Sequence, residues 1–119
     1  MNSDPLIVER AIPEIGQGIL VLKGPLTANN LHSLQNAIRR EQTRTLILDF
    51  TEVPYVDSSG LGSLVSAYVS GHKAGQQVVL TGINNRVAKL LEITKLEPFF
   101  LIFPTIEDAL EALSNSGQA

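Results

Sequence analysis

The sequence contains no cysteine and no tryptophan, and only 5% of its residues are aromatic. The absence of cysteine excludes disulfide bonds, thiolate nucleophiles and cysteine-ligated zinc. The core must be built from aliphatic side chains, and 44% of the residues are hydrophobic. A chain of 119 residues is the size of one ordinary domain. We expect one domain over residues 1–119, with its core at about residues 6–113 and short flexible tails.

Positive charge and long apolar runs are also scarce. Nine Lys and Arg residues stand against 12 Asp and Glu residues, which gives a formal net charge of −3. Nucleic-acid-binding domains usually need a basic face, so no nucleic-acid partner is expected. The purest apolar run, Phe99–Phe103, is far shorter than the about 20 residues that span a bilayer. The N-terminus has Asp4 and lacks the basic start of a signal peptide, so we expect a cytoplasmic protein without membrane insertion.

Five segments have the composition of β-strands. They are Leu6–Ile12, Gly18–Lys23, Thr45–Phe50, Gln77–Thr81 and Phe99–Phe103. Most are continuously apolar rather than alternating, which is typical of parallel strands covered by helices on both faces. The first is weaker and is followed by Pro13 and Gly16, so it is predicted to form an antiparallel edge hairpin with the second.

Helical patterns fill the intervals between these strands. The first helix carries Leu31, Leu34 and Ile38 at helical spacing, with Thr27 as its expected N-cap. The other expected boundaries are an end at Gly75, a start near Asn84, a start at Thr105 with Asp108 in a capping box, and a frayed tail over Ser114–Ala119. The order ββαβαβαβα predicts one α/β domain with a mostly parallel central sheet, an antiparallel N-terminal edge strand and about four helices.

The most informative segment is Val56-Asp-Ser-Ser-Gly-Leu-Gly62, where a strand passes into a helix. The first turn of a helix has unpaired N–H groups and a partial positive charge, which favour oxygen-rich side chains or a phosphate. Gly60 and Gly62 are expected to keep the surface bare for a partner's close approach. The simpler alternative is that Asp57, Ser58 and Ser59 are only an ordinary helix cap.

The helix after this motif has no charged residue between Ser58 and Gly71. Its face away from the predicted core carries only small residues, namely Gly62, Ser63, Ser66, Ala67 and Ser70. Exposed helices usually carry Lys and Glu on that face, so a smooth, uncharged one predicts a docking surface. The alternative is that the chain's own C-terminal helix covers it.

Enzymatic and metal chemistry find little support. The chain has no Gly-x-Ser-x-Gly nucleophile motif, and His72 lies about four helical turns from Ser58, roughly 20 Å at 1.5 Å per residue. Asp49 and Asp57 have no evident third ligand, so each is expected to serve a cap or turn. We expect no catalytic residue, no metal and no cofactor.

The motif, with its spacing to the strand before it and the helix after it, resembles the STAS domain family, specifically the anti-sigma factor antagonists. Leu46-Ile-Leu-Asp-Phe50, the turn Gly24-Pro-Leu-Thr27 and Phe103-Pro-Thr-Ile-Glu-Asp-Ala-Leu110 reinforce the resemblance, which extends from about Leu6 to Leu113. The sequence departs from the family in the turn Gly24-Pro-Leu-Thr27. This turn ends in Thr27, whereas the family often has an acid at that position, as in Gly-Glu-Leu-Asp.

The resemblance implies a protein that binds an anti-sigma factor with serine kinase activity and so frees a sigma factor. It implies that this kinase phosphorylates Ser58, that phosphorylation breaks the complex, and that a PP2C-type phosphatase reverses it. The residues expected to meet the partner are Thr27, Asp57, Ser58, Ser59, Gly60, Gly62, Ser63 and Ser66. The alternative is a constitutive STAS subunit of a transporter or signalling scaffold, in which Ser58 is only a cap.

Overall fold

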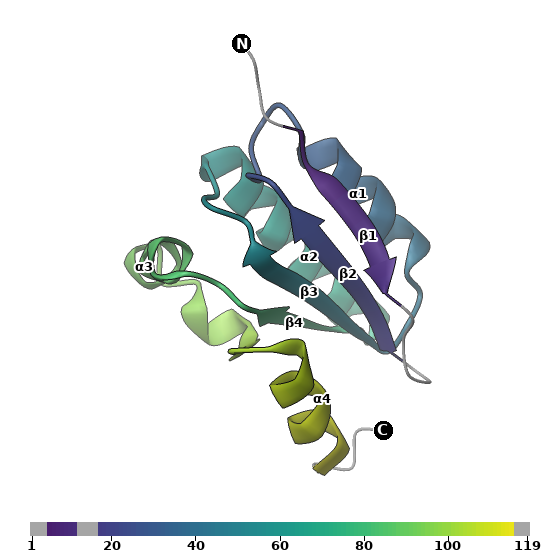
Figure 1. Ribbon diagram of the computed structural model, residues 1–119. Coiled ribbons are helices and arrows are strands. Elements are labelled where there is room, and N and C mark those ends of the chain that lie inside the picture. The colour runs from purple at the N-terminus through teal and green to yellow at the C-terminus, as the bar shows by residue number, and fades with distance from the viewer. Residues whose placement is uncertain (1–4, 12–16, 116–119) are drawn as a thin grey trace.

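The computed structural model describes residues 5–11 and 17–115 and contains one five-stranded sheet with helices on both faces (Figure 1). The elements are β1 (Ile7–Ala11), β2 (Gln17–Lys23), α1 (Leu31–Arg40), β3 (Thr45–Glu52), α2 (Ser58–Ala74), β4 (Gln77–Thr81), α3 (Asn85–Ile93), the 3₁₀-helix η1 (Glu97–Phe99), β5 (Leu101–Phe103) and α4 (Ile106–Asn115). The strand order is β1-β2-β3-β4-β5. Strand β1 runs antiparallel to β2 and the other pairs are parallel, which confirms the predicted fold class.

The sequential strand order determines where the helices lie. Right-handed crossovers that always step in the same direction place α1, α2 and α3 on one face of the sheet. Their buried side chains, such as Leu34, Leu64 and Leu91, join one core cluster, whereas Ala109 and Leu113 of α4 join a second cluster. Figure 1 shows α1 and α2 behind the sheet and α4 on its other side. The two faces explain why the parallel strands are continuously apolar.

Three helix boundaries are confirmed as predicted. Helix α2 ends at Gly75, whose φ of 77° is left-handed, a conformation that glycine adopts without a steric penalty. Helix α3 starts after Asn84, whose side chain accepts a 2.8 Å hydrogen bond from the Val87 N–H. Helix α4 starts after Thr105, whose hydroxyl accepts a 3.0 Å hydrogen bond from the Asp108 N–H. Asn84 and Thr105 each accept a hydrogen bond from an otherwise unpaired N–H group, and Gly75 ends its helix. All three act on residues next to them in sequence, so they could be predicted from the sequence.

The prediction that Thr27 caps α1 is wrong. Helix α1 begins at Leu31, and Asn30 occupies the capping position. The Asn30 amide folds back over the loop: its oxygen accepts from the Thr27 N–H at 2.8 Å and its nitrogen donates to the Pro25 carbonyl at 2.8 Å. These bonds hold residues 25–30 as a turn, so the helix starts after them.

The last strand is shorter than predicted and the last helix is longer. Strand β5 covers Leu101–Phe103 only, because Glu97–Phe99 forms η1 with Pro98 in its first turn and Phe100 is buried in the core. Helix α4 extends to Asn115, past the predicted fraying at Ser114. Residues 12–16 and 116–119, with the predicted hairpin turn and the end of the tail, lie outside the described residues. Within 5–11 and 17–115, the helices are too short or too polar to cross a membrane.

Candidate functional site

Two loops meet at the carboxyl ends of β2 and β3. Leu26, in the loop after β2, forms an isolated parallel bridge with Val56, in the loop after β3. The Leu26 N–H donates to the Tyr55 carbonyl at 3.1 Å, and the Asp57 N–H donates to the Leu26 carbonyl at 3.1 Å. These backbone bonds extend the pairing of β2 and β3 beyond the sheet and fix the segment that leads into α2.

Asp57 binds both loops through its carboxylate. It is the N-cap of α2, and its Oδ1 accepts a 2.8 Å hydrogen bond from the Gly60 N–H. Its Oδ2 accepts a 3.1 Å hydrogen bond from the N–H of Ala28 in the other loop. The predicted capping role of Asp57 is confirmed, and the bond to Ala28 adds a link between loops 29 residues apart in sequence.

Ser58 and Ser59 occupy the first two positions of α2, and both are exposed. Asp57 binds the N–H of Gly60, and the helix start at Ser58 and Ser59, with its partial positive charge, faces solvent. A hydroxyl here can accept a phosphoryl group, and the protein can accommodate the resulting anion. The arrangement therefore places two exposed hydroxyls at the start of α2.

The two glycines of the motif have different roles. A Cβ atom at Gly60 would lie 2.3 Å from the Leu26 carbonyl oxygen, whereas a Cβ atom at Gly62 would meet nothing within 4 Å. Gly60 is buried and lets α2 pack against the neighbouring loop; Gly62 is exposed. The prediction that both glycines keep the surface bare is confirmed for Gly62 and wrong for Gly60.

The exposed face of α2 is narrower than predicted. Ser63 and Ala67 are only 5% and 7% exposed, because this side of α2 faces α1 rather than solvent. The Ser63 hydroxyl donates to the Gly60 carbonyl at 2.6 Å and so supports the first turn of α2 from inside. Their assignment to the outer face is therefore wrong, whereas Gly62 and Ser66 are exposed as predicted.

Helix α4 does not cover this face, so that alternative is also wrong. Its Ala109 and Leu113 pack with Ile47 and Val79 on the opposite side of the sheet. Further along α2, Val69 is 43% exposed and adds an apolar group to the open face. The surface around the motif is thus formed by the start of α2 and its outward turns.

Sequence reasoning missed the support that α3 gives to the motif loop. The Asn84 amide donates to the Pro54 carbonyl at 3.0 Å, in addition to capping α3. The Arg86 guanidinium lies 5.1 Å from the centre of the Tyr55 ring, a cation–π arrangement. These residues lie about 30 positions from the loop in sequence, and no local pattern pairs them.

Asp49 does not serve a cap or a turn as predicted. It is buried in β3, where its Oδ1 accepts hydrogen bonds from the hydroxyls of Thr51 at 3.0 Å and Thr81 at 2.7 Å. These two hydrogen bonds offset the free-energy cost of burying the Asp49 carboxylate. Among the described residues, no three His, Asp or Glu side chains are grouped so that they could hold a metal ion.

Replacing Asp57 by alanine is expected to lower the free energy of unfolding by about 1–2 kcal/mol, because it removes the cap of α2 and the link to Ala28. Urea denaturation measures this change. Thr105→Ala is the matched control, since it removes the cap of α4 on the far side of the sheet. Both variants should lose comparable stability, and only Asp57→Ala should also perturb amide NMR signals around Ser58. An unperturbed Ser58 region would contradict the role of Asp57.

A family model of the STAS domain matches residues 7–109. The anti-sigma-B factor antagonist of Listeria monocytogenes is 34% identical over 99 residues, which cover 81% of this chain and 84% of that protein. Both matches include the motif loop and all of α2.

Two solved structures share the fold. A sulfate transporter family protein from Wolinella succinogenes has a TM-score of 0.80 at 21% identity, covering 92% of this chain and 93% of that one. SpoIIAA of Bacillus, at 18% identity, gives TM-scores of 0.75 in its unphosphorylated form, covering 92% and 97%, and 0.69 in its phosphorylated form, covering 90% and 99%. With a family model that spans β1 to α4 and a curated relative of similar length, the chain belongs to the STAS domain family.

Proposed function

We propose that the chain is an anti-sigma factor antagonist switched by phosphorylation of Ser58. Unmodified, it binds an anti-sigma factor that has serine kinase activity, so that a sigma factor is released. The observation that carries this proposal is the exposed Ser58 hydroxyl at the first position of α2, on loops that Asp57 holds rigid. The curated relative named an anti-sigma-B factor antagonist supports the same role.

The proposed docking surface consists of the start of α2, its outward face and the loop after β2. Its exposed or half-buried members are Thr27, Asp57, Ser58, Ser59, Gly62 and Ser66. Gly60 and Ser63 are buried below this surface and support it. Their contacts with Leu26 and with each other set the position of the first helical turn. Apart from the Asp57 carboxylate, this surface consists of small uncharged residues, which let the partner's active site approach the Ser58 hydroxyl closely.

The chain acts in this scheme as a substrate and binding module in the cytoplasm, and it catalyses no reaction itself. The kinase transfers the terminal phosphoryl group of ATP to the Ser58 oxygen, ADP leaves, and the hydroxyl proton passes to a base of the kinase. A PP2C-type phosphatase hydrolyses the phosphoester and restores the binding form. SpoIIAA, with the same fold, has been solved in both unphosphorylated and phosphorylated forms.

Incubation with the anti-sigma factor of the source organism and ATP is expected to add a single phosphate, which mass spectrometry should locate on Ser58. Ser59→Ala should still be modified, whereas Ser58→Ala should not. Both serines are exposed, so accessibility alone does not decide between them. A phosphate confined to Ser59 or Thr51 would exclude Ser58 as the switch.

The second candidate is a constitutive STAS subunit of a transporter or signalling scaffold. The fold shared with a sulfate transporter family protein favours it. In that case Ser58 is only part of a helix start, and substitutions there leave partner binding unchanged. Stoichiometric capture by a membrane transporter that tolerates Ser58→Asp would support this function over the first.

A further inference from the structure

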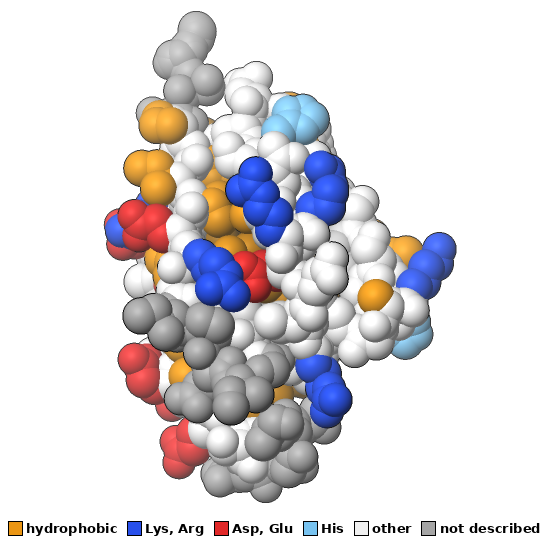
Figure 2. Space-filling model, turned by 90° about the vertical axis from the view of Figure 1, so that its right-hand side faces the viewer, with side chains coloured by type: hydrophobic (Ala, Val, Ile, Leu, Met, Phe, Trp, Pro, Cys, Tyr) orange, Lys and Arg blue, Asp and Glu red, His pale blue; other side chains and the backbone are white. Residues whose placement is uncertain are grey.

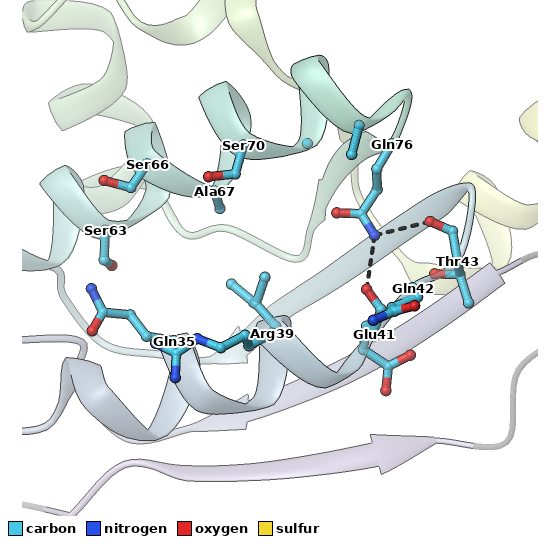
Figure 3. Close-up of a pocket in the computed structure, with 13 residues that line it drawn as sticks. Gln35, Arg39, Glu41, Gln42, Thr43, Ser63, Ser66, Ala67, Ser70 and Gln76 are labelled. Atoms are coloured by element: carbon cyan, nitrogen blue, oxygen red, sulfur yellow. Dashed lines mark hydrogen bonds between the residues drawn. The ribbon is translucent and has the colours of Figure 1, made fainter.

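A groove of about 660 Å³ lies between α1 and α2 and is lined by α2 from Ser63 to Ala74 (Figure 3). It exists because α2 presents only small residues on this flank, so no large side chain fills the space between the helices. Known small-molecule sites have volumes of roughly 300–1,000 Å³. The groove is therefore large enough for a metabolite and is separate from the motif loop.

The lining offers amides and hydroxyls from several elements. They belong to Gln35, Gln42, Ser66, Ser70 and Gln76. These groups both donate and accept hydrogen bonds, which suits a ligand with hydroxyl groups. The end wall is rigid, because the Gln76 amide nitrogen donates to the carbonyls of Glu41 at 3.1 Å and Thr43 at 2.9 Å, as the dashed lines in Figure 3 show.

The lining contains one arginine, Arg39, and one glutamate, Glu41. Arg39 lines the groove and donates to a neutral group, the Asn36 side-chain oxygen, at 3.1 Å. Glu41 also lines it, but its carboxylate is ion-paired with Arg10 and, in Figure 3, is directed away from the groove. The Arg39 guanidinium can thus bind an anionic group in the groove, and a guanidinium binds carboxylates and phosphates in bidentate fashion.

We propose that this groove binds a small organic anion that carries hydroxyl groups, a hydroxycarboxylate or a sugar phosphate. The anionic group lies on Arg39, and the hydroxyls bond to Gln35, Ser66 and Ser70. The simpler account of Arg39 is that it complements the carbonyl end of α1, as its neighbour Arg40 does. The two arginines therefore provide a matched pair for the test.

The test is an NMR titration of the ¹⁵N-labelled full chain with citrate and, separately, with ribose 5-phosphate; ribose is the uncharged control. At least one anion should give saturable shifts at the amides of Ser66, Ser70 and Gly71, and ribose should give none. Arg39→Gln should weaken binding about tenfold or more, whereas Arg40→Gln, exposed and outside the groove, should change it less than about twofold. Ser70→Leu should abolish binding by filling the groove.

The comparison of the two anions decides which acid group the site prefers. Absence of saturable shifts with both anions would overturn the proposal. Equal weakening in Arg39→Gln and Arg40→Gln would also overturn it, because it would indicate only general attraction to the basic end of α1. Shifts confined to Ser58 and Ser59 would assign the anion to the helix start instead. Melting temperatures of all three variants establish that each remains folded.

Discussion

Replacing Ser58 by aspartate is expected to weaken binding of the anti-sigma factor by about 30- to 5,000-fold, whereas Ser58→Ala should bind constitutively. A negative charge at this position would have to be desolvated against a surface fitted to a neutral hydroxyl. A charge left buried and unpaired at an interface costs about 2–5 kcal/mol, which corresponds to that range of affinity. Surface plasmon resonance of the two variants measures the difference.

The fold itself should tolerate the charge at Ser58. The residue is exposed at the first position of α2, where the helix dipole stabilises an anion by up to about 2 kcal/mol. Both variants should therefore keep melting temperatures close to that of the wild type. Ser59→Asp, one position further on the same exposed turn, is the matched control and should lose less affinity. If Ser58→Asp and Ser58→Ala bound the anti-sigma factor with equal affinity, Ser58 would have only a structural role at the start of α2. That result would favour the constitutive STAS subunit.

Gly60→Ala and Gly62→Ala are expected to change stability in opposite directions. A Cβ atom at Gly60 would lie 2.3 Å from the oxygen and 2.9 Å from the carbon of the Leu26 carbonyl, so the backbone must shift. Overpacking of this kind costs about 1–3 kcal/mol. At Gly62 a Cβ atom would meet nothing within 4 Å, and alanine in a helix gains up to about 1 kcal/mol over glycine.

Urea denaturation of the two glycine variants tests the close approach of α2 to the loop after β2. Gly60→Ala should also shift the amide NMR signals of Leu26 and Ala28, because α2 and that loop are joined through Asp57. Gly62→Ala should leave them in place. If Gly60→Ala were as stable as Gly62→Ala, the packing of α2 against Leu26 described here would be incorrect.

The fold could be predicted from the sequence because its signals are local. Continuous apolar runs identified the parallel strands, and the caps Asn84 and Thr105 sit beside the helices that they start. The error at the start of α1 was also local, because a competing turn lies in the same stretch of chain. Thr27 looked like a cap, but hydrogen bonds of Asn30 to Thr27 and Pro25 displace the start of α1.

In the candidate site, local features could be predicted and contacts with distant residues could not. Asp57 and Ser58 were predictable because an acid followed by serines before a helical pattern describes the start of a helix in one stretch of chain. The burial of Gly60 and Ser63 could not be predicted, because it depends on contacts with Leu26 and with α1, which lie more than 20 residues away in sequence. The groove between α1 and α2 was equally inaccessible, because two separate helices and a loop form it.

Figure 2 shows another face of the molecule, on which Lys and Arg side chains surround a hollow with hydrophobic and acidic groups inside. Most acidic side chains in this view lie along its left edge, and most basic ones lie nearer the centre and the right.

The most direct test of the switch is an isothermal titration of the anti-sigma factor with two preparations of the wild-type chain, one unmodified and one phosphorylated by the kinase on Ser58. The phosphate would carry a charge of about −1.5 to −2 at pH 7, next to Asp57 and at the centre of the proposed docking surface. We predict measurable binding by the unmodified chain and an affinity at least about 30-fold weaker for the phosphorylated one. Equal affinities of the two preparations would contradict the phosphorylation switch.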